Sequence, residues 1–176
     1  SKERKHAIMR KSKINISGFK IGTAENREGL TGVTVILAPD GGATAGVDVR
    51  GCAPGTRESD LLDSRKTVQK IHAVVLSGGS AFGLEAASGC VKYLAEQGVG
   101  FPIGNVCVPI VCSAVLFDLM IGDEKAYPDL LMGYEAAKSA SSEFLSGCNG
   151  AGTGATVGKL LGFGNAMKSG AGYHEI

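Results

Sequence analysis

The sequence contains no tryptophan, and only 6% of its 176 residues are aromatic. Its formal net charge is +1, so it has neither the basic surface nor the aromatic stacking platforms that nucleic-acid binders use. No apolar run is long enough to cross a bilayer. We therefore expect neither nucleic acid nor a membrane as a partner, and the length suits one domain.

Cysteine pairs with metal-ligand spacing are also missing. The five cysteines are odd in number, widely spaced and without a CxxC pair: Cys52, Cys90, Cys107, Cys112 and Cys148. No secretory signal precedes them, which predicts reduced thiols in a cytoplasmic protein. We expect no metal site.

Glycine, in contrast, is abundant: 27 of the 176 residues are glycine, about twice the usual share of ~7%. Such a chain needs many close approaches between backbone segments. Residues 1–13 are rich in Lys and Arg and have no apolar periodicity, so we expect a basic, flexible arm. Residues 14–176 are expected to form a single domain.

The most informative stretch is 71–89, IHAVVLSGGSAFGLEAASG. Its short apolar run, its Gly78-Gly79 pair and the helical spacing that follows predict a strand, a tight turn and a helix. Ser80 falls at or just before the first helical turn, where it fits an ordinary helix cap as well as a residue near a ligand. A small molecule can be held at such a turn.

Other segments give simpler predictions. The run 33–38 followed by Pro-Asp-Gly-Gly predicts a hairpin with a partner strand over 43–49. The spacing of apolar residues over 130–144 predicts a helix, and Gly98 is expected to end the helix that begins after Ser80.

Three motif interpretations fail on individual residues. The Gly158-Lys159 pair lacks the P-loop glycine, since Thr153 stands in its place, and Leu160 replaces the required Ser or Thr. A nucleophile elbow centred on Ser80 would need glycine where Phe82 stands. The segment GGSAFG is not a dinucleotide fingerprint either, so we expect no nicotinamide or other cofactor.

Several segments together resemble one family. In order they are TGVTVILAPDGGATAGVDVRG, APGTRESDLL, HAVVLSGGSAFGLEAASG and GAGTGATVGKLLG, followed by NAMKSG. Over residues 18–172 the chain resembles the L-aminopeptidase D-esterase/D-amidase family, which includes β-peptidyl aminopeptidases and a nylon-oligomer amidase. The resemblance implies an α+β fold, an αββα sandwich of two stacked sheets flanked by helices. It also implies a precursor that cuts itself to expose an N-terminal Ser or Thr nucleophile, which hydrolyses N-terminal amide bonds of peptides or related amides.

The chain departs from that pattern at its C-terminal side. The family's nucleophile and its oxyanion-stabilising asparagine lie downstream of the segment resembling NAMKSG, and neither is present here. We therefore expect an incomplete sandwich that is inactive alone, with a second chain supplying the nucleophile or with association into a homo-oligomer. The alternative is a truncated or degenerate family member that acts as a binding or assembly subunit.

Few site residues carry over from the resemblance. Lys159 matches a lysine near the nucleophile of the nylon-oligomer amidase, which implies a catalytic role, although a solvated lysine at a helix start fits equally well. Phe117 stands where that amidase has a tyrosine, so a pocket wall is expected without the phenolic hydrogen bond. The predicted strand, turn and helix, rather than the resemblance, lead us to expect Gly78, Gly79 and Ser80 beside the peptide or amide substrate.

Two carboxylates are assigned no catalytic role, and one further hypothesis for the function stays open. Asp118 and Asp48 are interpreted as structural. An unrelated hydrolase, in which Ser80 is activated by His72 or His174, is a separate alternative.

Overall fold

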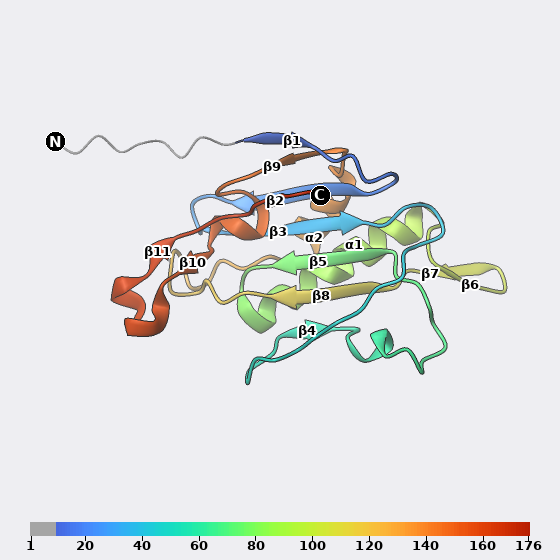
Figure 1. Ribbon diagram of the computed structural model, residues 1–176, viewed down its shortest axis with the longest axis horizontal. Helices are drawn as coiled ribbons and strands as arrows, with labels where there is room; N and C mark the ends of the chain where they lie inside the picture. Colours follow the sequence, from blue (N-terminus) through green and yellow to red (C-terminus); the bar gives the residue numbers. More distant parts are fainter. Residues whose placement is uncertain (1–9) are drawn as a thin grey trace.

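The computed structural model describes residues 10–176, and a five-stranded mixed sheet lies at its centre (Figure 1). The strand order is β2-β3-β5-β8-β4. These strands are β2 (Lys20–Asn26), β3 (Thr31–Leu37), β5 (Ala73–Ser77), β8 (Val111–Val115) and β4 (Thr56–Arg57). Strands β5 and β8 are parallel, and the other neighbours are antiparallel. The combination of mixed sheets with few helices confirms the predicted α+β class.

Side-chain alternation gives this sheet two different faces. Val33 and Val35 on β3 and Val75 on β5 are fully buried in the core that the two helices cover. Ile36 and Leu76 alternate with them and point to the opposite face. The β-branched runs therefore build a sheet in which both faces carry apolar side chains.

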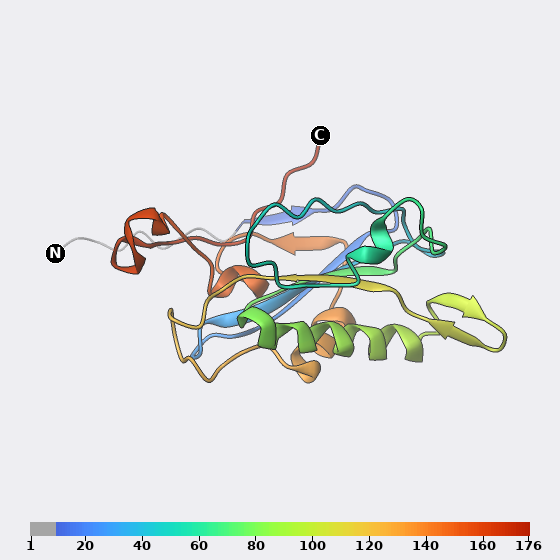
Figure 2. The same cartoon turned by 90° about the horizontal axis from the view of Figure 1, so that it is seen from below.

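Two helices cover one face of the sheet (Figure 2). Helix α1 (Glu85–Glu96) follows the 3-10 helix η2 (Ser80–Leu84) without a break and connects β5 to β8, so the predicted strand, turn and helix are confirmed. Helix α2 (Leu130–Lys138) begins after Asp129, whose side chain accepts a hydrogen bond from the Met132 backbone N–H at 2.8 Å.

Glycines allow the two helices to approach each other closely. A Cβ atom on Gly133 would lie 1.9 Å from the Ala86 carbonyl oxygen, and one on Gly89 would lie 1.9 Å from the Leu130 carbonyl oxygen. Only residues without a side chain fit at this crossing.

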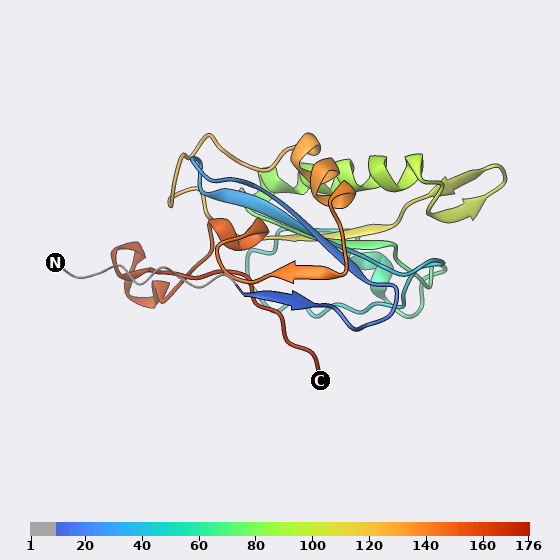
Figure 3. The ribbon, with the colours of Figure 1, turned by 90° about the horizontal axis from the view of Figure 1, so that it is seen from above.

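Smaller elements lie on the opposite face of the sheet (Figure 3). Strands β1 (Lys11–Lys13) and β9 (Glu143–Leu145) pair antiparallel there, and the C-terminal tail runs beside them. The remaining elements of the C-terminal region are η3 (Gly150–Thr153), β10 (Thr156–Val157), η4 (Lys159–Leu161), η5 (Phe163–Asn165) and β11 (Met167–Lys168). Strands β10 and β11 form a two-stranded antiparallel sheet.

The last elements lie outside the central sheet, and a hairpin among them projects from one end of the molecule (Figure 1). Strands β6 (Phe101–Ile103) and β7 (Val106–Val108) form this hairpin after α1, and η1 (Asp60–Leu62) lies in the loop between β4 and β5. Gly98 has a φ of 67° just beyond α1, in the position predicted for it. No helix within residues 10–176 is both long and apolar enough to span a bilayer.

The predicted hairpin of 33–38 with 43–49 was wrong. The turn itself forms, since the Gly42 N–H donates to the Pro39 carbonyl at 2.9 Å. The returning segment does not pair with β3, because both edges of β3 are already occupied by β2 and β5. Only Ala43 makes a bridge, and its partner is Ile71.

The predicted helix over 130–144 was too long. It ends at Lys138, and the Ser139 hydroxyl donates to the Ala136 carbonyl at 2.9 Å. Serine side chains compete with helical backbone hydrogen bonds in this way, and the chain continues into strand β9.

The arm prediction was also wrong for its last three residues, because Lys11–Lys13 form β1. Residues 1–9 of that arm lie outside the described part of the chain.

Candidate functional site

A tight turn follows strand β5, and a buried carboxylate holds it. Asp118 is 3% exposed, and its Oδ1 accepts a hydrogen bond from the Gly79 N–H at 2.6 Å. Its Oδ2 accepts a second one from the Thr31 hydroxyl at 2.8 Å. A buried carboxylate is stabilised by such donors, so Asp118 ties the Gly78-Gly79 turn to the start of β3.

Packing around this carboxylate explains why the turn contains two glycines. A Cβ atom on Gly78 would lie 2.1 Å from Asp118 Oδ2 and 2.3 Å from the Thr31 hydroxyl. Gly79 has a φ of 78°, and a Cβ atom there would lie 2.5 Å from the Tyr127 Cβ. Both glycines are thus required by contacts within the chain.

Ser80 is held at the same turn in a backbone conformation that is uncommon for a non-glycine residue. Its φ is 53°, and its N–H donates to the Leu116 carbonyl at 3.0 Å. It does not act as the helix cap, because Gly79 occupies that position and no side-chain cap bond forms. Backbone strain of this kind clusters at functional sites, and the Ser80 side chain is partly exposed.

Phe117 lies next to this turn and meets the C-terminal region. Its ring is 45% exposed, and its centroid lies 6.1 Å from that of Phe163. Lys159 belongs to the same C-terminal loop as Phe163, in η4. The structure thus brings Gly78, Gly79, Ser80 and Phe117 together and places the Lys159 loop beside them.

The Lys159 side chain makes local contacts. Its Nζ donates to the Thr156 carbonyl at 2.5 Å and to the Thr156 hydroxyl at 2.7 Å. A lysine with two acceptors from one residue is oriented rather than freely solvated, although these bonds do not by themselves point to catalysis. The catalytic role of Lys159 and the pocket role of the other four residues stay predictions.

A second lysine supports the loop that leads to Lys159. Lys168 Nζ donates to the carbonyl oxygens of Thr153 at 2.5 Å, Gly152 at 3.2 Å and Ala155 at 3.3 Å. The ammonium group therefore ties together three backbone carbonyls in and just after η3, where a cation is favourable.

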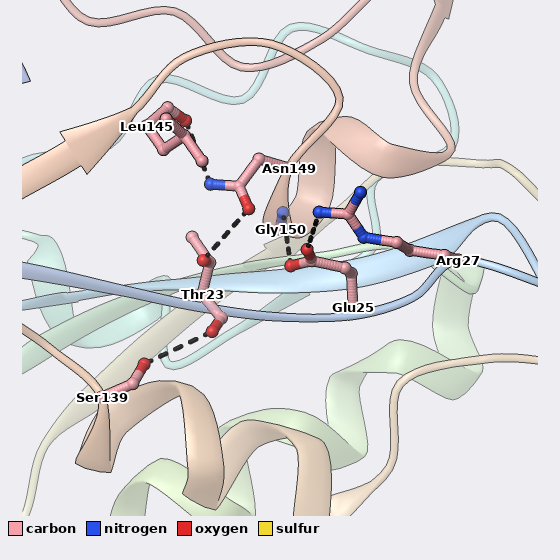
Figure 4. Close-up of polar contacts among 7 residues, drawn as sticks. All are labelled: Thr23, Glu25, Arg27, Ser139, Leu145, Asn149 and Gly150. Carbon is pink, nitrogen blue, oxygen red and sulfur yellow. Dashed lines mark hydrogen bonds and ion pairs between the residues drawn. The ribbon is translucent and has the colours of Figure 1, made fainter. Parts of the chain in front are cut away.

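The start of η3 is anchored to the edge strand β2 by polar contacts (Figure 4). Asn149 is buried, its amide nitrogen donates to the Leu145 carbonyl at 3.0 Å, and its Oδ1 accepts from the Thr23 hydroxyl at 3.3 Å. The Gly150 N–H donates to Glu25 at 3.3 Å. Residues 149–155 are thus fixed at both ends.

An apolar groove of about 530 Å³ runs along the sheet face opposite the helices. It is lined mainly by aliphatic and aromatic side chains from the sheet, from β9 and from the C-terminal tail, among them Ile14, Ile36, Leu76, Phe144 and Tyr173. Leu76 is 40% exposed although it lies on a central strand. Ser77 and Leu116 line the groove, whereas Ser80 and Phe117 stand just beyond its wall.

The alternative in which His72 activates Ser80 was wrong. His72 precedes β5 and Ser80 follows it, so a strand of five residues, roughly 16 Å, separates them. The His72 Nδ1 instead accepts from the Ile110 N–H at 3.1 Å. His174 follows Tyr173, whose ring centroid lies 5.8 Å from that of Phe144. The version of the alternative with His174 stays a prediction.

Two other kinds of feature could carry chemistry in residues 10–176, namely clustered metal ligands and buried cysteines. No cluster of three or more His, Cys, Asp or Glu side chains that could hold a metal ion occurs there. Burial raises the pKa of the Cys90 thiol to about 12 and also raises that of Cys112, which suppresses the nucleophilic thiolate.

Comparisons with known proteins identify the family of this chain. Residues 13–170 match peptidase family S58, and the chain belongs to that family. It is 46% identical over 131 residues to an uncharacterized aminopeptidase of Mycobacterium tuberculosis (strain H37Rv), covering 74% of this chain and 38% of that protein. It is also 37% identical over 149 residues to a 6-aminohexanoate-oligomer endohydrolase of Kocuria sp. (strain KY2), covering 84% of this chain and 39% of that protein.

A solved structure shares the fold. The PH0078 protein from Pyrococcus horikoshii superposes with a TM-score of 0.65 at 22% identity, covering 84% of this chain and 46% of that one. The chain therefore spans less than half the length of the relatives it matches. The family assignment from the sequence is confirmed, and the relatives carry aminopeptidase and amide-hydrolase names.

Proposed function

We propose that this chain is the N-terminal part of an aminopeptidase or amidase that hydrolyses N-terminal amide bonds of peptides or related amides. In this proposal the nucleophilic Ser or Thr, exposed by self-cleavage, lies on a segment that this chain does not contain. Membership of peptidase family S58 and the names of the relatives support the hydrolase class.

The open face of the five-stranded sheet is the observation that carries the proposal. Leu76 on the central strand β5 is 40% exposed, and the apolar groove lies directly over it. An apolar face on a central strand needs a covering layer. We infer that a second sheet covers this groove and completes an αββα sandwich.

The covering layer would also bring the nucleophile to the turn. Ser77 and Leu116 line the groove, Gly78 and Phe117 follow them directly in the chain, and Ser80 follows Gly79. A nucleophile at the rim of the covering layer would meet these residues and Lys159. Lys159 would then stabilise charge that develops during amide hydrolysis, while Phe117 forms an apolar wall.

The test is hydrolysis of amino-acid p-nitroanilides by the full gene product and by three variants. We expect Lys159→Met to lower kcat by about 100-fold or more while the nucleophile segment stays bound. Leu76→Lys should release that segment and abolish activity, because it places a charge in the covered groove. The matched control Lys92→Met, on the exposed side of α1, should keep full activity.

Three results would contradict the proposal. Full activity of Leu76→Lys would show that nothing essential packs on the groove. Hydrolysis by the isolated 176-residue chain would show that the nucleophile lies within it. If the full gene product hydrolyses none of these amides, a non-catalytic binding or assembly subunit is the better assignment.

A further inference from the structure

Three separate stretches of the chain carry the candidate site residues, and one buried carboxylate lies where these stretches meet. The turn with Ser80 follows β5, Phe117 follows β8, and Lys159 follows η3. Asp118 comes directly after Phe117 and is 3% exposed. Its contacts therefore determine how the three stretches are placed relative to one another.

The first of these contacts is with the turn after β5. Asp118 Oδ1 accepts a hydrogen bond from the Gly79 N–H at 2.6 Å. The next N–H along the chain, that of Ser80, donates to the Leu116 carbonyl at 3.0 Å. Ser80 has a φ of 53°, and a non-glycine residue keeps such a conformation only where its surroundings hold it. These hydrogen bonds therefore fix Ser80 relative to the stretch that follows β8.

The second contact is with the loop that leads to Lys159. A Cβ atom on Gly154 would lie 2.3 Å from Asp118 Oδ2, so the backbone just after η3 packs against the carboxylate. The carbonyls of the two residues that flank Gly154 accept hydrogen bonds from Lys168 Nζ. The start of the loop is thus held by the carboxylate and by an ammonium group, a few residues before Lys159.

The carboxylate itself is anchored to the central sheet. Its Oδ2 accepts a hydrogen bond from the Thr31 hydroxyl at 2.8 Å. Thr31 is 1% exposed and begins β3, which is paired with a neighbouring strand on both edges. A side chain that is held by a rigid strand keeps one orientation, and it passes that orientation on to the groups that it contacts.

We propose that Asp118 is a positioning residue for amide hydrolysis, which sets Ser80, Phe117 and the Lys159 loop in the arrangement that the reaction needs. The inference rests on the proposed function and adds to it the group that assembles the site. Asp118 is buried, so it acts through these neighbours rather than on the substrate. Misplacing a reacting group by about 1 Å can lower a rate by on the order of 100-fold.

The test is steady-state hydrolysis of amino-acid p-nitroanilides by the full gene product and its variants. We expect Asp118→Ala to lower kcat at least about 30-fold while KM changes by less than about threefold, because positioning acts on the reacting geometry. Asp118→Asn keeps an acceptor for the Gly79 N–H, and its amide can donate to the Thr31 hydroxyl. This conservative variant should keep kcat within about threefold of the wild type.

Two further variants separate positioning from stability. Leu94→Ala creates a cavity in the core between α1 and the sheet, away from the three stretches, so it should lower stability but leave kcat unchanged. Thr31→Val keeps the carboxylate and removes only its anchor, and it should lower kcat about tenfold even if Asp118→Ala does not fold. Circular dichroism of each variant checks that it is folded.

Amide hydrogen exchange of the same proteins supplies a readout that does not depend on activity. Asp118→Ala should speed exchange of the Ser80 N–H, whereas Asp118→Asn should leave it slow. Faster exchange together with an unchanged kcat would make the carboxylate a structural support only and would overturn the inference.

The remaining outcomes are also distinct. An equal fall of kcat in Asp118→Asn and Asp118→Ala would assign the effect to charge, and an equal fall in Leu94→Ala would assign it to stability; either result would overturn the inference. In both cases an active wild type would leave the proposed function standing. A wild type that hydrolyses none of these amides would contradict the proposed function and the inference together.

Discussion

The two faces of the five-stranded sheet carry similar apolar side chains but are covered differently. On one face, α1 and α2 cross so closely that glycine is required at Gly89 and Gly133, and Val75 is fully buried. On the other face, the next residue along the strand, Leu76, is 40% exposed beside a groove of about 530 Å³. The chain therefore completes the core between the sheet and the helices, whereas apolar side chains on the other face stay partly exposed.

The largest loss of stability is expected from a substitution where α1 and α2 pack most closely. Gly133→Leu should lower the free energy of unfolding by about 3 kcal/mol or more, because its Cβ alone would lie 1.9 Å from the Ala86 carbonyl oxygen. Urea unfolding followed by circular dichroism measures this change. The same substitution at Gly46, where an added Cβ would have no neighbouring atom within 4 Å, should have little effect; equal losses would contradict the packing.

Removing the Asp118 carboxylate at the turn should cause the second-largest loss of stability. Asp118→Ala leaves the Gly79 N–H and the Thr31 hydroxyl without their buried acceptor, which should cost about 3 kcal/mol of unfolding free energy. Asp48→Ala removes an exposed surface pair with Arg50 and serves as the control. If both variants unfold at the same urea concentration, Asp118 does not hold the turn.

A pair of neighbouring truncations compares the two faces directly. In the isolated chain, Val75→Ala should cost about 2 kcal/mol, whereas Leu76→Ala should cost less than about 1 kcal/mol because its side chain is partly solvated. In the full gene product, covering the groove should raise the cost of Leu76→Ala to ~3 kcal/mol. An unchanged Leu76→Ala value there would mean that no layer packs on this face.

The smallest effect concerns pH. Burial lowers the pKa of His72 from its ordinary value of 6.5, so the folded protein binds this proton less readily than the unfolded chain. Stability should therefore be complete above pH 6.5 and fall as the pH drops from there through the folded pKa. His72→Gln keeps an acceptor for the Ile110 N–H and should flatten this part of the profile in urea titrations. An identical slope in the variant would assign the loss to other groups.

Local signals predicted part of this fold well. The apolar run 73–76 with Gly78-Gly79 predicted strand, turn and helix correctly, because adjacent residues determine all three. The hairpin over 33–38 and 43–49 failed because strand pairing is a competition, and β2 and β5 occupy both edges of β3. No local pattern in residues 43–49 reveals that competition.

In the candidate site too, local patterns predicted some features, whereas contacts between residues distant in the sequence were not predicted. The strand-turn-helix pattern pointed to Gly78 and Ser80 and the resemblance to Phe117, and the Ser80 N–H bond to the Leu116 carbonyl brings the two segments together. Asp118 was assigned only a structural role, and its pairing with Thr31 joins residues 87 positions apart, which spacing cannot show. The three-carbonyl contact of Lys168 was missed entirely, although the segment NAMKSG contained it.

The central claim is that the open face of the sheet receives a second segment that carries the nucleophile. Intact mass spectrometry on the gene product purified from its own source, with an amidase assay on the same fractions, tests it most directly. We predict a second chain that begins with Ser or Thr, co-purifies with this one and accompanies the activity. The 176-residue chain found alone, with no hydrolysis in any fraction, would contradict the claim.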